Sequence, residues 1–470
     1  MFMHFGICTF AACEHNTGDP NKYPATLFNP SDLDTDQWAA TAAAMGAAEI
    51  CLSVVHEGGF TLWPSKQTPY GVQNATHWRG GNGDVVKDFV ASCRKYAIKP
   101  CFYMAPPHNG YLLRQKLPPD VYMEKVSAML EELLTNYGEV HRLWWDHWCT
   151  LVDVSKQGTA GSNSTQYAHW IAKVRALQPK ALILPGPDGT LADVGEINPG
   201  VYPLWNSVQI PASPPNQAFQ CNPNPSCQPC KQGGGAGYRS WLPVESDGTI
   251  QGCPLCKSHF WFWNGPPKAP PGQRVLTATE LWQKYLRTVG RGANFIMNLP
   301  PNATGQFPPE FVEEVTSFGA AVNRTFSRPI MSVGVHTAAS IPLACTPGSG
   351  GAQQQQHVVL NFTAADLGEA VEFDMIVTTE DNAKGQRIAS YTVEVYVAGQ
   401  EEGTEWQLLP ANGKTVGHKV IDVLPFPIQT FPVPTAVEAV RFTCTGAAPG
   451  AGDVAYLRSF AVYKSSPPAA

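Results

Sequence analysis

The chain has 470 residues, about three ordinary domains, although a single α/β barrel can take up well over half of that length. Hydrophobic residues make up 43% and charged residues 15%, so the chain can bury a large core and is neither disordered nor a coiled coil. The net charge is −6, and no basic run is long enough to follow a nucleic-acid backbone or an anionic membrane. No apolar stretch approaches membrane-spanning length. We therefore expect a soluble protein that binds neither nucleic acid nor membrane.

Residues 2 to about 326 alternate short apolar runs with amphipathic stretches, a pattern typical of β-α units on a parallel sheet. The predicted strands are Phe2–Cys8, Glu49–Val55, Lys99–Ala105, Arg142–Asp146, Ala181–Pro185, His259–Trp263 and Asn294–Leu299. The predicted helices are 31–46, capped by Ser31-Asp32, and 83–96, 119–137, 165–177, 277–289 and 309–323. This pattern predicts a (β/α) TIM-like barrel over residues 1–330, with one unit degraded or missed. A doubly wound sheet is the alternative, but the turn Gly6-Ile7-Cys8 lacks the expected Gly-rich phosphate motif.

A second domain is predicted over residues 331–470. A Gly- and Gln-rich stretch at 347–356 resembles a linker, and beyond it the helical period disappears. Ser390–Val397 alternates strictly between polar and apolar residues, and shorter alternating runs follow between turn residues. We expect an antiparallel β-sandwich.

Cysteines and glycosylation motifs indicate the compartment. Five of the thirteen cysteines lie between Cys221 and Cys256, in a predicted insertion at 219–258, which suggests disulfides in a secreted loop. Zinc knuckles are the alternative there, because two Cys-x-x-Cys pairs occur. Asn-x-Ser/Thr motifs occur at Asn74, Asn163, Asn302, Asn323 and Asn361. We expect a secreted, lysosomal or vacuolar protein whose signal peptide is absent from this chain, with Cys345 and Cys444 as a candidate disulfide and at least one free thiol.

Polar side chains are concentrated at the predicted strand ends, where barrels carry their reactive groups. They are His4, His56, Glu57, Tyr103, Asp146 and Asp188. Carboxylates, histidines and aromatic rings without metal-ligand spacing predict a sugar site that needs no metal or cofactor. Asp146 lies among tryptophans that include Trp144, which favours a functional role over a helix cap or a surface salt bridge. His4 alone would equally fit a buried core histidine.

Several motifs stand near the predicted strands. The N-terminal ones are Met3-His4-Phe5-Gly6, Phe28-Asn29-Pro30 and the run from His56 to Lys66. The later ones are Phe102-Tyr103, Leu143-Trp-Trp-Asp146 and the run from Val289 to Pro301. In this order they resemble the motifs of glycoside hydrolase family twenty-nine, the α-L-fucosidases. The resemblance implies a (β/α) barrel, a retaining mechanism and a fucosylated oligosaccharide or glycan as substrate.

The resemblance also implies roles for individual residues. Asp146 corresponds to the family's nucleophile. The segment Gly186-Pro-Asp188, Glu196 and Trp205 resembles the subgroup that prefers α-1,3/1,4-linked fucose, which makes Glu196 the acid/base residue. Glu245 is the other candidate for acid/base, and is otherwise assigned to substrate binding or loop support. The residues assigned to substrate binding are His4, Glu14, His56, Glu57, Tyr103, Trp144, Glu245 and Trp261.

Three positions depart from the family. Glu57 replaces the second histidine of "HHDGF", His15 follows Glu14 where the family has "EW", and Thr190 replaces an arginine. A carboxylate in place of a histidine keeps hydrogen-bond acceptors, loses a donor and adds negative charge near the nucleophile. We therefore expect an active exo-acting enzyme, and the alternative is a catalytically weakened fucose- or glycan-binding protein on the same barrel. The sequence leaves the linkage attacked and the oligomeric state open.

Overall fold

A computed structural model gives the fold. It describes residues 1–146, 163–184, 192–196, 207–208, 240–241, 244–252, 260–265, 272–335, 339–345, 356–362, 371–401, 404–411, 413, 415–430, 437–448 and 452–469. Most of the predicted Cys-rich insertion at 219–258 lies outside these residues, as do Trp148, Asp188 and Thr190.

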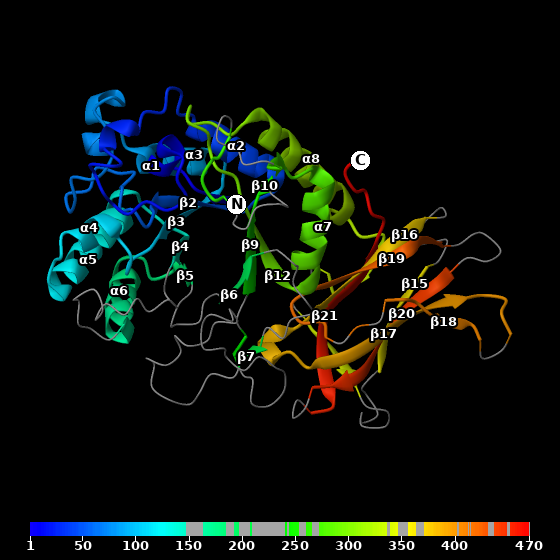
Figure 1. The fold of residues 1–470 in the computed structure, drawn as a ribbon. Helices are drawn as coiled ribbons and strands as arrows, with labels where there is room; N and C mark the ends of the chain where they lie inside the picture. The colour runs from blue at the N-terminus through cyan, green and yellow to red at the C-terminus, as the bar shows by residue number, and fades with distance from the viewer. Residues whose placement is uncertain are drawn as a thin grey trace.

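Eight parallel strands form one curled sheet (Figure 1). They are β1 Phe2–Met3, β2 Glu49–Val55, β3 Lys99–Met104, β4 Arg142–Trp145, β5 Leu182–Leu184, β6 Ala192–Glu196, β9 Val244–Thr249 and β12 Ala293–Asn298. Their order is β5-β4-β3-β2-β1-β12-β9-β6, so the two edge strands follow one another along the chain. We call the carboxyl-terminal edge of this curled sheet the rim.

Helices follow the strands, as the sequence predicts. The longer ones are α2 Thr35–Met45, α3 Val85–Lys95, α5 Pro119–Asn136, α6 Asn163–Leu177, α7 Ala278–Thr288 and α8 Pro309–Phe326. The short ones are α1 Ile7–Ala11, α4 Gly110–Arg114, and the 3-10 turns η1 Ala25–Leu27, η2 Val72–Asn74, η3 Arg79–Gly81 and η5 Val289–Arg291. Asp84 and Thr277 cap α3 and α7 by accepting from backbone N–H groups in the first turn. The cap predicted at Ser31-Asp32 is wrong, since Asp34 caps α2 by accepting from Gln37.

Three strand predictions need correction. The first strand ends at Met3, and the last two residues of the predicted strand Phe2–Cys8 belong to helix α1 Ile7–Ala11. Within the predicted strand His259–Trp263, the described residues 260–263 form bends and coil. The strand at that point of the sheet is β9, whose Val244-Glu-Ser-Asp-Gly-Thr sequence lacks an apolar pattern because it carries buried acids.

Two antiparallel sheets follow α8. One has the order β13-β21-β16-β19 with β14 also paired to β21, and the other has the order β15-β20-β17-β18. Their bounds are β13 Met331–Val333, β14 Ile341–Ala344, β15 His357–Asn361, β16 Glu372–Glu380, β17 Ile388–Val397, β18 Trp406–Leu408, β19 Val420–Gln429, β20 Val437–Ala447 and β21 Val454–Tyr463. Side chains of both sheets share one apolar core, and the predicted Cys345–Cys444 disulfide is confirmed. The remaining elements are the pairs β7 Ser207–Val208 with β8 Ser240–Trp241, β10 Gln251–Gly252 with β11 Arg274–Val275, and the 3-10 turn η6 Asn382–Lys384.

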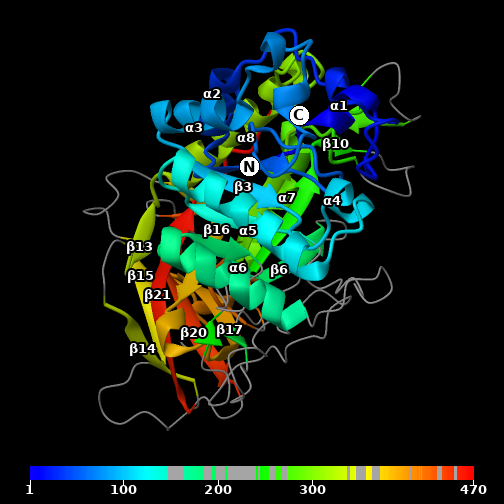
Figure 2. The same cartoon turned by 90° about the vertical axis from the view of Figure 1, so that its left-hand side faces the viewer.

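The antiparallel sheets pack against the helices of the curled sheet (Figure 2). Met375, Val377 and Ile421 belong to the same apolar cluster as the core of the curled sheet. The rings of Phe326 in α8 and Tyr463 in β21 lie 5.4 Å apart. This continuous core makes the C-terminal sheets a structural support of the N-terminal unit. Among the described helices, none is long and apolar enough to cross a membrane.

A buried ion-pair cluster lies inside the curled sheet near the amino-terminal ends of its strands. The Arg142 guanidinium contacts Glu49 at 2.5 Å and Glu245 at 2.6 Å. Arg142 and Glu245 are buried, and the Asn294 amide also donates to Glu245 at 3.2 Å. One cation therefore bridges carboxylates from two other strands.

We expect Arg142→Met to lower the free energy of unfolding by about 3–5 kcal/mol, because it leaves two carboxylates without their buried counter-charge. Chemical denaturation measures this change. Arg274→Met is the control, because it removes an exposed bridge to Glu280 and should cost less than about 1 kcal/mol. Equal losses in both variants would contradict a structural role for the buried cluster.

Candidate active site

The central contact at the rim joins Asp146 and Tyr103. Asp146 directly follows β4, and its backbone N–H donates to Met104 of β3 at 2.9 Å. The Tyr103 hydroxyl donates to Asp146 Oδ2 at 2.6 Å, a short charge-assisted hydrogen bond. Burial, together with the Asp146 charge, raises the pKa of Tyr103 well above its usual value, so the phenol stays a donor. Adjacent parallel strands thus hold the carboxylate in a fixed orientation.

Tyr103 is itself held between two flat side chains. Its ring stacks on His56 at 5.3 Å and on Trp144 at 5.4 Å between centroids. Trp144 donates from Nε1 to Glu245 at 2.8 Å. The position of Asp146 is therefore linked through two aromatic rings to the buried ion-pair cluster.

A second network connects His4 to the segment that carries Trp261. Asn298 Oδ1 accepts from the backbone N–H of His4, and its Nδ2 donates to the Trp261 carbonyl at 2.8 Å. On the other side, the Glu14 carboxylate accepts from the backbone N–H groups of Trp261 at 2.7 Å and Phe262 at 3.4 Å. The Trp261 ring lies 5.3 Å from the His4 ring. Asn298 and Glu14 thus clamp the 261–262 backbone beside the rim.

The same network fixes the tautomer of His4. Its Nδ1 lies 2.9 Å from Asn298 Oδ1, which can only accept, so Nδ1 carries the proton. Burial lowers the pKa of His4 from 6.5 to about 4. At neutral pH the ring is therefore uncharged and its Nε2 is an acceptor, suited to a hydroxyl group.

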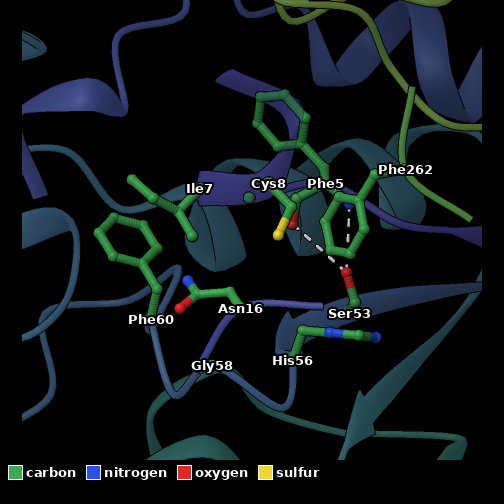
Figure 3. A pocket seen from close by; sticks show the side chains of 10 residues that line it. Phe5, Ile7, Cys8, Asn16, Ser53, His56, Gly58, Phe60 and Phe262 are labelled. Atoms are coloured by element: carbon green, nitrogen blue, oxygen red, sulfur yellow. Dashed lines mark hydrogen bonds between the residues drawn. The ribbon is translucent and has the colours of Figure 1, made fainter. Parts of the chain in front are cut away.

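Aromatic and small polar side chains form the wall beside His56 (Figure 3). The Phe262 ring meets His56 edge-on at 5.0 Å. Ser53 Oγ accepts from the Phe5 backbone N–H and donates to the Phe5 carbonyl, which ties β2 to the turn after β1. These contacts place an imidazole beside flat aromatic rings, the side-chain types that contact the hydroxyl edges and apolar faces of sugars.

Two departures from the family meet at the rim. Glu57 follows His56 after β2, and its Oε2 lies 3.0 Å from Nδ1 of His15, in the segment after α1. The His15 side chain is 71% exposed, whereas the Glu57 side chain is 11% exposed. The hydrogen bond to Glu57 raises the pKa of His15, with smaller contributions from nearby carboxylates.

Two of the predicted substrate-binding residues hold other parts of the protein in place. Glu245 lies in the buried cluster, where Arg142, Trp144 and Asn294 donate to its two oxygens, so its surroundings fit a structural role. Glu14 contacts the backbone of Trp261 and Phe262, which fits a positioning role. The remaining predicted residues with described side chains lie together around Tyr103. They are His4, His56, Glu57, Tyr103, Asp146, Trp144 and Trp261.

Glu196, the predicted acid/base residue, is the last residue of β6, and its Cα pairs with that of Asp247 in β9. Asp247 is buried and alternates onto the same face of β9 as Glu245, two residues closer to the rim. The sequence analysis did not single out Asp247 or Asn298 as site residues, although Asn298 lies within the run from Val289 to Pro301 that carries part of the family resemblance. Within the described part of the chain, no cluster of three or more His, Cys, Asp or Glu side chains could hold a metal ion.

Comparisons with known proteins point to the α-L-fucosidases. The profile of the α-L-fucosidase family matches residues 1–183. α-L-Fucosidase 1 from Arabidopsis thaliana is 27% identical over 441 residues, which cover 89% of this chain and 78% of the plant protein. These matches support an α-L-fucosidase, which is a glycoside hydrolase. Its fold is similar to a Bacteroides ovatus structure named for the same family, with a TM-score of 0.73, 25% identity and coverage of 99% and 72% of the two chains.

A glycoside hydrolase family twenty-nine fucosidase from Ruminococcus gnavus, solved in complex with fucose, shares the fold at a TM-score of 0.71. It is 21% identical, and the match covers 99% of this chain and 92% of the bacterial one. The similarity of residues 1–183 to the α-L-fucosidases, together with the polar and aromatic side chains gathered there, makes the rim around Asp146 the candidate active site.

We expect Tyr103→Phe to lower kcat about 10- to 100-fold on an aryl α-L-fucoside, because it removes a charge-assisted hydrogen bond to Asp146. Steady-state kinetics measures the change. Tyr396→Phe is the control, because Tyr396 packs on Trp406 in the C-terminal sheets. A Tyr103→Phe enzyme with unchanged kcat would contradict the role of this contact.

His4 predicts a pH dependence of stability. Its folded pKa lies below that of an unfolded histidine, so the unfolded state binds more protons between about pH 6.5 and 4. The free energy of unfolding should therefore fall as the pH falls through this window, by on the order of 3 kcal/mol from this group. Denaturant unfolding of wild type and His4→Gln at pH 7 and pH 4.5 measures the difference. If His4→Gln loses as much free energy of unfolding between pH 7 and pH 4.5 as the wild type does, His4 is not the source of this pH dependence.

Proposed function

We propose that the protein is an exo-acting, retaining α-L-fucosidase that removes terminal α-1,3/1,4-linked L-fucose from glycans. The observation that carries the proposal is the 2.6 Å hydrogen bond from Tyr103 to Asp146 at the rim, among the rings of His4, His56 and Trp144. The match of residues 1–183 to the α-L-fucosidase family and the fucose complex of the similar R. gnavus structure support fucose as the sugar. The α-1,3/1,4 preference rests on the sequence around Glu196.

In the proposed reaction Asp146 attacks the anomeric carbon of fucose while the bond to the leaving oxygen breaks. Glu196 gives its proton to that oxygen, which leaves a covalent fucosyl-Asp146 ester. Glu196 then removes a proton from water, which displaces Asp146 and releases fucose with retained configuration. Tyr103 holds the attacking carboxylate, and the neutral His4 accepts from a sugar hydroxyl. Glu245 is a poor choice for the acid because Arg142 and Trp144 already bind it.

We propose that the curled sheet closes as the (β/α) barrel of residues 1–330, and that the C-terminal sheets form a galactose-binding-like sandwich.

We also propose that the protein follows a secretory route. Disulfides Cys8–Cys13, Cys51–Cys101 and Cys345–Cys444 support an oxidising compartment, as do the glycosylation motifs. Cys93 is a buried free thiol.

We expect Asp146→Ala to lower kcat by about 10³-fold or more on an aryl α-L-fucoside, because no other carboxylate occupies that position. Added azide should restore turnover and yield the β-fucosyl azide. Full activity of Asp146→Ala would overturn the assignment, and a wild-type protein that binds fucose without hydrolysing it would favour the binding-protein alternative.

The assignment of Glu196 as the acid/base residue is tested in the same assay, hydrolysis of an aryl α-L-fucoside with and without azide. Glu196→Ala should spare the first step with good leaving groups, slow the second, and yield the α-azide. Glu245→Gln serves as the matched comparison, and its main effect should be on stability. If the Glu245 variant shows the acid/base pattern and Glu196→Ala does not, the roles of the two glutamates must be exchanged.

A further inference from the structure

The disulfide between Cys51 and Cys101 lies inside the curled sheet, beneath the candidate active site. It joins β2 to β3 at positions whose Cα atoms are register partners, and both side chains are fully buried. Cys101 lies two residues before Tyr103, so their side chains project to the same inward face of β3. The two cysteines and Tyr103 belong to one apolar cluster, which also contains Phe2 and Trp144. The disulfide is therefore part of the layer of side chains that supports the Tyr103 ring.

The register between β2 and β3 is irregular close to this disulfide. Pairing runs without a shift from Glu49 to Ser53, whose partner is Tyr103, and the register then shifts before Val55. Just beyond the shift, the His56 ring stacks on the Tyr103 ring at 5.3 Å. The ladder is thus irregular where two side chains of the candidate active site meet, and the covalent link lies two residues before Ser53.

The contacts of Tyr103 are sensitive to the position of β3. Its hydroxyl donates to Asp146 Oδ2 at 2.6 Å, and a hydrogen bond weakens when its distance and angle depart from the optimum. Functional groups generally need to be held to within about 0.5 Å of their productive geometry. A movement of β3 against β2 by that amount would loosen both the hydrogen bond to Asp146 and the stacking on His56.

We propose that the Cys51–Cys101 disulfide is a positioning element for catalysis, which holds β3 against β2 so that Tyr103 orients Asp146. The proposal deepens the proposed fucosidase function and rests on it for the reaction that is measured. The alternative is a disulfide that only stabilises the fold, by restricting the unfolded chain across a sequence separation of 50 residues. The burial of the bond beneath Tyr103 favours the positioning role.

Hydrolysis of an aryl α-L-fucoside tests this role through its coupling to the Tyr103 hydroxyl. Cys51→Ala/Cys101→Ala should lower kcat about tenfold, because a misplaced Tyr103 no longer orients the attacking carboxylate. In a Tyr103→Phe background the same two substitutions should lower kcat by less than about twofold, because the hydrogen bond that the disulfide positions is already absent. A disulfide that only stabilises the fold would change kcat by the same factor in both backgrounds.

Two further variants separate positioning from stability and from packing. Cys345→Ala/Cys444→Ala is the matched control, because it removes a disulfide of the C-terminal sheets that spans 99 residues. It should lower the melting temperature and leave kcat unchanged in both backgrounds, with every kcat measured well below the melting temperature of the variant. Cys51→Val/Cys101→Ala restores apolar volume at the buried position and should lose kcat as the Ala pair does. It also replaces the Ala pair as the test if that variant does not fold.

Full kcat in Cys51→Val/Cys101→Ala, or equal losses with and without the Tyr103 hydroxyl, would overturn the positioning role. Crystal structures of the wild type and this variant give a readout that does not depend on turnover. The distance between Tyr103 Oη and Asp146 Oδ2 should exceed 2.6 Å in the variant, and an unchanged distance would also overturn the role. If the wild type does not hydrolyse the fucoside, the proposed function fails and the distance alone decides the role of the disulfide.

Discussion

The buried guanidinium of Arg142 organises the interior of the curled sheet. It lies between Glu49 and Glu245, so three strands that are distant in sequence share one ion-pair cluster. Glu245 then accepts from Trp144, Trp144 stacks on Tyr103, and Tyr103 donates to Asp146. Because side chains alternate along each strand, Arg142, Trp144 and Asp146 lie on the same inward face of β4 and its end. The rim carboxylate is thus supported by a continuous series of contacts that begins at a charge buried under the site.

Much of the fold could be predicted from periodicity, and its failures have a physical cause. Strands β2 to β5 and β12 are apolar enough to be recognised, and helices α3 and α7 begin at side-chain caps. Strand β9 was missed because Glu245 and Asp247 replace apolar residues on its inward face, where ion pairing makes their burial possible. The aromatic run at 259–263 suggested a strand, but Gln251 and Glu14 hold the 260–262 backbone as an irregular segment. Pattern alone cannot separate a strand from a segment fixed by side-chain hydrogen bonds.

The candidate active site could likewise be predicted only in part. Strand ends located His4, Tyr103 and Asp146, since that edge follows from the parallel topology. Partners that come from distant segments could not be predicted, because no local signal links them. Asn298 holds His4 across 294 residues of sequence, and Glu14 holds Trp261 across 247. The sequence identified residue types suited to sugar chemistry, whereas the structure shows which distant side chains hold them in place.

The charge at the rim constrains which chemistry this arrangement can support. A retaining mechanism needs one carboxylate that stays ionised, and Tyr103 provides a donor that remains protonated at any physiological pH. His4, whose pKa burial lowers to about 4, adds no charge to the rim near neutral pH. Glu57 adds a further carboxylate there, and its Oε2 lies 3.0 Å from Nδ1 of His15. The segment that carries His15 and the strand end that carries Glu57 are therefore joined by one hydrogen bond, so the two departures from the family meet at a single contact.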